Sequence, residues 1–169
     1  MANYNKLLAL LKENNFDTQT LGPLLFDHVL PQHVSPENVD IAFDLIVENQ
    51  RGLKLCGIPM FSRNSLIPFI DPPLFQRIDG LTVLLPLDKI ENYPLPDLGW
   101  VWSWHKWYVL MLNDVDDQGW MYQLVFLQLQ LKWHGAYYFG DFVRRRLWVR
   151  MRQREKDPEN SSMGCNESM

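Results

Sequence analysis

In two segments of this sequence, tryptophans or arginines stand at every second position, and this pattern constrains the fold more than any other feature. Trp100, Trp102 and Trp104 are spaced two residues apart, and residues 142–154 repeat that alternation with arginines. Successive side chains of a β-strand point to opposite faces, so one face of the first segment should carry three indoles. On the same argument, one face of the second segment should carry Arg144, Arg146, Trp148, Arg150, Arg152 and Arg154.

These two faces are expected to form a ladder of stacked side chains. A planar guanidinium gains about 0.5–2 kcal/mol by stacking on an indole, whereas an unpaired row of arginines repels itself. The pattern therefore favours a role in holding the fold together over a role in chemistry. The residues expected in this structural ladder are Trp100, Trp102, Trp104, Trp120, Trp148, Arg144, Arg146 and Arg150.

The composition favours one domain with a substantial core. The 169 residues are 47% hydrophobic, and the formal net charge of -4 argues against general nucleic-acid binding. The two cysteines, Cys56 and Cys165, do not indicate a disulfide framework, which favours a reducing intracellular compartment. No apolar run approaches the roughly 18 residues of a membrane-spanning helix, so we expect a soluble or peripheral protein.

The N-terminal region predicts a helix and a strand. Residues 4–13 place four leucines on a narrow arc, which is typical of an amphipathic helix that either packs on the domain or binds a membrane surface or partner. Ser35 and Pro36 resemble the start of another helix. Residues 41–47, in contrast, alternate as a strand does.

Prolines dominate residues 54–98, and each one removes a backbone donor. We expect mostly loop there, with short edge strands such as 81–85. Two apolar runs, 58–61 and 66–70, are unusual for a solvated loop. They form either a lid over the core or an exposed patch that touches a membrane or a partner.

After Gly99 the pattern predicts a long hairpin, with strands over 100–112 and 120–131 joined by a turn at 114–119. An aromatic connection, 133–140, then leads to the arginine strand. Residues 155–169 are polar and aperiodic, and we expect them to be disordered.

Catalytic and metal-binding patterns do not emerge from the sequence. Asp114, Asp116 and Gly119 match the start of a calcium loop, but Val125 stands where the closing glutamate belongs, so a turn stabilised by its own aspartates is expected. The four histidines show no zinc spacing, and no phosphate loop or nucleophile elbow is present. We expect no enzyme, no metal and no cofactor.

Four ordered blocks carry a resemblance to a known family. They are 98–107 (LGWVWSWHKW), 115–122 (VDDQGWMY), Trp133 and 142–150 (FVRRRLWVR), and 47–51 (VENQR) extends the match upstream. Together they strongly resemble the dysferlin (DysF) domain over roughly residues 41–154.

The resemblance implies an all-β domain. In that family the N- and C-terminal DysF halves pair through long antiparallel strands with tryptophan–arginine stacking. The expected organisation is a partly helical extension over 1–40, a DysF domain over 41–154 with a Pro-rich insertion at about 54–98, and a polar tail over 155–169.

The resemblance also implies a function at membranes. The chain looks most like small fungal DysF proteins that act in sporulation, where the prospore membrane extends around daughter nuclei. We expect a non-enzymatic module, peripheral to an intracellular membrane, that recognises a membrane lipid, anionic lipids included, or a membrane-bound partner. The alternatives are a pure protein adaptor and a regulator of peroxisome or ER membranes like the DysF peroxins. The expected contact residues are Ile67, Phe69, Tyr137, Tyr138, Phe139, Arg152 and Arg154.

Overall fold

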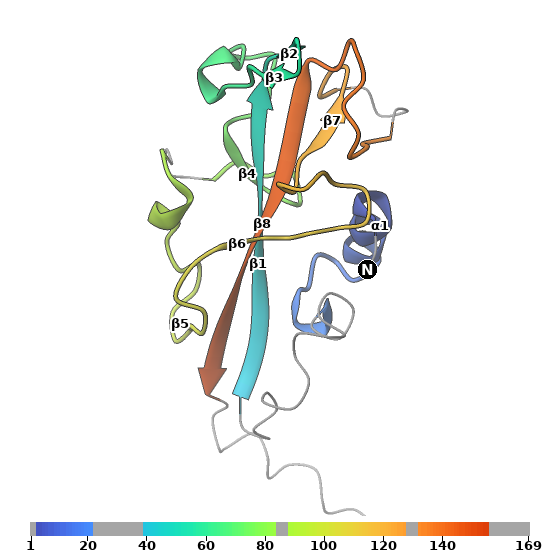
Figure 1. Cartoon of the computed structure of the whole chain (residues 1–169). Helices are drawn as coiled ribbons and strands as arrows, with labels where there is room; N and C mark the ends of the chain where they lie inside the picture. The colour runs from blue at the N-terminus through green and yellow to red at the C-terminus, as the bar shows by residue number, and fades with distance from the viewer. Residues whose placement is uncertain (1–2, 22–38, 84–87, 128–131, 156–169) are drawn as a thin grey trace, which may run out of the picture.

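Two long antiparallel strands form the axis of the molecule. The computed structural model describes residues 3–21, 39–83, 88–127 and 132–155. Strands β1 (Val39–Arg51) and β8 (Val143–Glu155) stay paired along their full lengths, and Figure 1 shows them crossing the molecule from end to end. The strand predicted over 41–47 is confirmed and is longer at both ends.

Each face of this strand pair packs against a different core, because period two separates the side chains. Odd-numbered apolar residues of both strands belong to the larger cluster, which also contains Tyr4, Leu7 and Leu11. The even-numbered Ile46 and Trp148 join a second cluster with Phe75, Ile90 and Trp107. In the larger cluster, β1 and β8 contribute Phe43, Leu45, Val47, Val143, Leu147, Val149 and Met151.

Short strands complete an antiparallel sheet on either side of this pair. β4 (Phe75–Arg77) pairs with β1, and three strands pair with successive parts of β8. The expected all-β architecture with a short N-terminal helix agrees with this sheet. The three strands on β8 are β5 (Val101–Trp102), β6 (Tyr108–Val109) and β7 (Met121–Gln123).

The long hairpin predicted from 100–112 and 120–131 is wrong. The amides of Ser103 and Trp104 both donate to the carbonyl of Met151, at 3.0 and 3.3 Å, so two residues oppose one and the alternation stops. β5, β6 and β7 each pair with β8 and not with one another. Residues 128–131 lie outside the described part of the chain.

Helix α1 (Tyr4–Glu13) occupies the position that the leucine pattern predicts. The side chain of Asn3 caps it by accepting from the amide of Lys6 at 2.9 Å, and the carboxylate of Asp114 accepts from the amide of Tyr4 at 3.0 Å. Tyr4, Leu7 and Leu11 are buried, so the helix packs on the domain. The helix start expected at 35–36 lies outside the described residues.

The Pro-rich region is mostly irregular, as expected. It contains a small hairpin of β2 (Lys54–Leu55) and β3 (Ile58–Pro59). The edge strand predicted over 81–85 is limited to one bridge, between Thr82 and Gln76, within the described residues, which omit 84–87. The short 3-10 turns are η1 (Gln19–Leu21), η2 (Arg63–Ser65) and η3 (Ile90–Asn92). None of the described helices is both long and apolar enough to cross a bilayer.

Candidate functional site

The even-numbered face of β8 carries the arginine row, and β1 supplies polar partners for it. The two strands run antiparallel in one register, so each even residue of β8 faces an even residue of β1. The polar pairs are Arg144 with Gln50, Arg146 with Glu48, Arg150 with Asp44 and Arg154 with Asp40.

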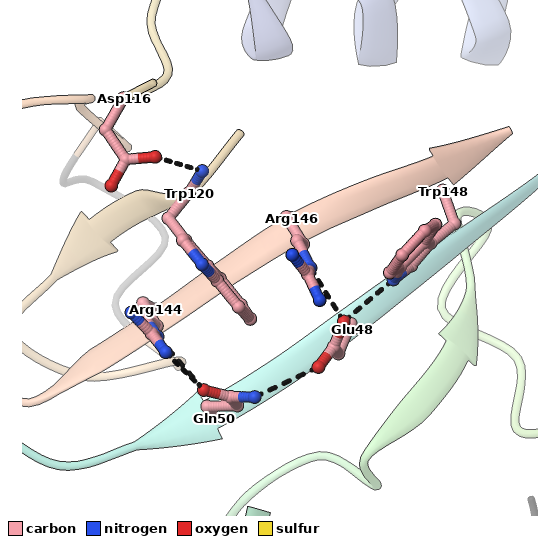
Figure 2. Close-up of polar contacts among 7 residues, drawn as sticks. All are labelled: Glu48, Gln50, Asp116, Trp120, Arg144, Arg146 and Trp148. Atoms are coloured by element: carbon pink, nitrogen blue, oxygen red, sulfur yellow. Dashed lines mark hydrogen bonds and ion pairs between the residues drawn. The ribbon is translucent and has the colours of Figure 1, made fainter. Parts of the chain in front are cut away.

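Trp120 lies between two of these arginines (Figure 2). The Cζ atom of Arg144 is 3.9 Å from the centroid of the indole, and that of Arg146 is 4.3 Å from it. Arg146 also lies 4.5 Å from the ring of Trp148. Planar guanidinium groups at these distances gain cation–π and dispersion energy.

The turn before β7 fixes the position of Trp120. Oδ1 of Asp116 accepts from the amides of Gln118 and Trp120 at 2.9 and 2.8 Å, and Oδ2 accepts from the hydroxyl of Tyr122 at 2.7 Å. Gly119 has a φ of 82°, a conformation that glycine adopts readily. The prediction of a turn stabilised by its own aspartate is therefore confirmed for Asp116. Burial, with the nearby Asp116, raises the pKa of Tyr122 to about 12.

Polar bonds connect the arginines across the two long strands. Oε2 of Glu48 accepts from Nε of Arg146 at 2.8 Å and from Nε1 of Trp148 at 2.7 Å. Oε1 of Gln50 accepts from Arg144 at 2.7 and 3.0 Å, while its amide donates to Glu48 at 3.0 Å. Figure 2 shows these bonds as one chain of contacts across β1 and β8.

The arginine row continues toward the end of β8 with different partners. The guanidinium of Arg150 lies 4.2 Å from the ring of Trp102 and donates to the carbonyls of Trp104 and His105 at 3.0 and 3.1 Å. Arg152 and Arg154 lie 4.5 and 5.0 Å from the ring of Trp100. Their carboxylate partners are Asp44 and Asp97 for Arg152, and Asp40 for Arg154.

Asp44 is the least satisfied member of this array. Its Oδ2 lies 3.2 Å from Nε of Arg152, but neither atom has a hydrogen-bond partner, because the two groups are not aligned. Burial therefore prevails over the attraction of Arg152 and raises the pKa of Asp44 to about 6. The carboxyl group lines a cavity of about 220 Å³ together with Tyr93 and Asp97.

Trp104 does not join the face that holds Trp100 and Trp102. The chain bends after Trp102, and Trp104 packs instead on the larger core. The centroid of its ring lies 5.9 Å from that of Phe43 and 5.3 Å from that of Tyr108. The expectation of three indoles on one face is therefore wrong for Trp104. Arg150 contacts Trp104 through its backbone carbonyl.

Arg145 is a residue that the sequence pattern did not single out. It is buried on the odd-numbered face, with its guanidinium 3.9 Å from the ring of Trp133. One Nη donates to the hydroxyl of Tyr4 at 3.2 Å, and burial lowers the pKa of the guanidinium. Arg145 thus links β8 to helix α1.

At the opposite end of the sheet from Arg154, three loops expose apolar side chains. They are the β2–β3 hairpin, the segment after η2 and the connection that enters β8, and Figure 1 shows them gathered where β1 ends and β8 begins. Phe69 is 107% exposed and Phe139 is 100% exposed, so no residue in the described part of the chain shields either ring. We call this set the apical surface: Leu53, Leu55, Ile58, Met60, Ile67, Phe69, Ile70, Tyr138 and Phe139.

The apical side chains exclude one of the two interpretations of the Pro-rich segment. Residues 58–60 and 67–70 are exposed, so the runs 58–61 and 66–70 do not form a lid over the core. Phe61 is the exception, because it packs edge-on against Tyr122 and Tyr137 at 5.7 and 6.1 Å.

The loops that carry the apical surface are fastened to the sheet. Arg51 at the end of β1 forms an ion pair with Asp71, whose carboxylate also accepts from the amide of Ile67 at 2.8 Å. The hydroxyl of Tyr137 accepts from the amide of Lys54 at 3.0 Å, which joins the connection to the β2–β3 hairpin. Tyr137 is therefore partly buried and positions the neighbouring exposed pair.

The structure divides the expected contact residues into two groups. Ile67, Phe69, Tyr138 and Phe139 share the apical surface. Arg152 and Arg154 lie at the far end of β8 and are already paired with carboxylates, so the structure does not bring them near the apical loops. Among the described residues, no group of three or more His, Cys, Asp or Glu side chains could hold a metal ion.

Comparison with known proteins gives relatives in two fungi and an insect. No protein-family model matches the chain. It is 40% identical over 114 residues to the meiotically up-regulated gene 65 protein of Schizosaccharomyces pombe, covering 67% of this chain and 44% of that protein. It is 37% identical over 126 residues to the sporulation-specific protein 73 of Saccharomyces cerevisiae, covering 64% of this chain and 84% of that protein.

The third relative is much larger than the matched region. A tectonin beta-propeller repeat-containing protein of Drosophila melanogaster is 34% identical over 108 residues, covering 63% of this chain and 7% of that protein. The chain thus spans less than half of the Schizosaccharomyces relative but most of the Saccharomyces one.

Proposed function

Because the chain belongs to the family of the sporulation-specific protein 73 of Saccharomyces cerevisiae, we propose that it acts in sporulation as a non-enzymatic, peripheral membrane module. Its task in this proposal is membrane remodelling, most specifically extension of the prospore membrane. The names of two fungal relatives, one sporulation-specific and one meiotically up-regulated, support the setting. The membrane role is our inference from the DysF resemblance and the apical surface.

Assignment to the DysF type is part of this proposal. Two features support it: the full-length antiparallel pairing of β1 with β8, and the alternation of arginines with tryptophans on one face. In such a module the stacked array stabilises the scaffold, and function belongs to loops that the scaffold positions.

The observation that carries the proposal is the exposure of large apolar side chains on the apical surface. Phe69 and Phe139 project from two separate loops, and Ile58 projects from a third. Exposed apolar side chains gathered at one end of a domain are typical of a membrane or protein contact. The hydrogen bonds of Asp71 and Tyr137 hold the loops that carry these side chains in one conformation.

Localisation in sporulating cells tests this function. A fluorescently tagged chain should follow the growing prospore membrane, and Ile67→Asp combined with Phe69→Asp should release it into the cytoplasm. Both side chains are solvent-exposed, so the double variant should keep the cooperative unfolding of the wild type. A double variant that stays on the membrane would refute the role of the apical surface.

A protein adaptor is the second candidate. The observation that favours it is the fixed geometry of the loops, because a preformed pattern of apolar side chains also suits a protein partner. In that case purified protein would not float with liposomes of any composition. Affinity purification from sporulating cells would then recover a stoichiometric membrane protein, and the Ile67→Asp and Phe69→Asp changes would abolish its recovery.

A further inference from the structure

We propose that the apical surface recognises loosely packed lipid, and that it binds by shallow insertion of apolar side chains with little contribution from anionic headgroups. The inference rests on the membrane role proposed above, and it specifies lipid packing as the property of the bilayer that determines binding. It differs from the sequence expectation, in which arginines attract anionic lipid.

The distribution of cations supports this choice. The arginine row of β8 is engaged by indole rings, carboxylates and backbone carbonyls along its length. Its exposed end, at Arg154, lies at the other end of the sheet from the apical loops. A headgroup bound at Arg154 would therefore not share a bilayer surface with Phe69.

Among the described residues, few charged side chains lie near the apical side chains. Arg51 and Asp71 neutralise each other in an ion pair. The ammonium of Lys54 lies 5.8 Å from the ring of Tyr137, and Arg63 donates to the carbonyl of Asp88. Lys54 and Arg63 can assist binding to an anionic surface, but the large apolar side chains outnumber them.

The backbone around Phe69 displays the ring. Phe69 has a φ of 66°, which a bulky residue rarely adopts, and its side chain is fully exposed. The amides of Ile70 and Asp71 both donate to the carbonyl of Ile67, at 3.2 and 2.9 Å, and the carboxylate of Asp71 holds the amide of Ile67. The loop thus keeps an uncommon conformation that places an aromatic ring outside the protein surface.

The shape of the surface favours lipid over a protein groove. Phe69 and Phe139 project from different loops, and no described residue covers either ring, so a protein would need separate deep pockets to cover them. A bilayer with packing defects accepts side chains at any spacing. Loop tips reach only about 5–10 Å into the headgroup and acyl boundary, so affinity should depend on how tightly that layer is packed.

Vesicle binding with the full-length chain tests the inference. The Cys165→Ser variant leaves Cys56, which is exposed in the β2–β3 turn, as the single site for an NBD fluorophore. We would titrate it with pure phosphatidylcholine vesicles, comparing small with large radii and unsaturated with saturated chains. We expect a blue shift and stronger binding on small or unsaturated vesicles, unchanged by high salt.

Matched variants locate the contact. Phe69→Asn with Phe139→Ser should lower the partition coefficient at least about tenfold, since two exposed rings are lost; asparagine is chosen because it tolerates a positive φ. Leu98→Ser is the control, because Leu98 is 100% exposed but lies outside the apical loops. It should bind as the wild type does, and all variants should retain the wild-type unfolding midpoint.

Two other outcomes overturn the inference in distinguishable ways. If binding requires phosphatidylserine and is lost on Lys54→Gln with Arg63→Gln or in high salt, the lipid contact is electrostatic, and the proposed membrane function stands without this inference. If no vesicle binds and Cys56 stays in water, the apical surface does not contact lipid, and the adaptor function replaces the membrane contact as well.

Discussion

Glu48 and Arg146 face each other directly across β1 and β8, and Oε2 of the carboxylate lies 2.8 Å from Nε of the guanidinium. The same oxygen accepts from the indole of Trp148 at 2.7 Å. One carboxylate therefore holds both an arginine and a tryptophan of the stacked face. Both side chains of this pair are largely removed from water.

Glu48→Ala should destabilise the protein by about 2–4 kcal/mol, because it leaves a largely buried guanidinium and an indole N–H without their acceptor. Glu48→Gln should cost about 1 kcal/mol, since the amide oxygen still accepts one hydrogen bond. Denaturant unfolding of both variants measures the difference. Equal losses would mean that the charge, and not the lost acceptor, dominates the interaction.

Asp44→Asn should stabilise the protein at neutral pH. Burial raises the pKa of Asp44 to about 6 in the folded state, against an ordinary value of 3.8, so the ionised carboxylate costs stability above pH 6. That cost is relieved as the pH falls from 6 toward 4, where the protonated group resembles asparagine. We expect the variant to be more stable by about 1–3 kcal/mol at pH 7.5 and by nearly zero at pH 4.

The comparison of Asp44→Asn with the wild type isolates this group from the other carboxylates, which titrate in both proteins. Unfolding free energies measured from pH 4 to pH 8 give the difference curve. A flat curve would show that the pKa of Asp44 is the same in the folded and unfolded states. A variant that loses stability as the pH rises would show that the attraction of Arg152 outweighs burial.

The sequence alone predicts the long strands, because residue types that alternate with period two indicate a strand whose two faces have different surroundings. It placed residues 41–47 and the arginine face of β8 correctly. It failed for Trp104, because the bend after Trp102 depends on two amides sharing the carbonyl of Met151. That carbonyl lies far away in sequence, so no local pattern reveals the bulge.

The acidic partners of the arginines were also missed, although the signal was present. Asp40, Asp44 and Glu48 recur at even positions of β1, which is the spacing that opposes a row of cations on a paired strand. Their match with Arg146 or Arg154 requires the register of two segments about 100 residues apart. The sequence also could not decide whether Phe69 is buried under a lid or exposed on a patch, because the same apolar composition suits both.

Asp116→Ala should destabilise the turn that positions Trp120. It removes acceptors for two amides and for the hydroxyl of Tyr122, at a cost of about 1–3 kcal/mol. Asp116→Asn should cost less, since the carboxamide oxygen of asparagine can still accept from the backbone amides of the turn. Thermal unfolding with calcium and with a chelator provides the control: neither should move the wild-type midpoint, and a midpoint that rises with calcium would restore a metal-loop interpretation.

Replacement of single arginines by lysine separates planar stacking from charge. Arg146 contacts two indoles and Glu48, and Arg150 contacts Trp102 and two carbonyls. Lysine keeps the charge but lacks the planar, multiply donating group, so Arg146→Lys and Arg150→Lys should each cost about 1–3 kcal/mol. Arg154→Lys is the control and should cost less than about 0.5 kcal/mol, because that side chain is 45% exposed. Thermal unfolding of the three variants decides the question, because unchanged midpoints for the first two would show that the arginines act as point charges and that the stacked face does not stabilise the fold.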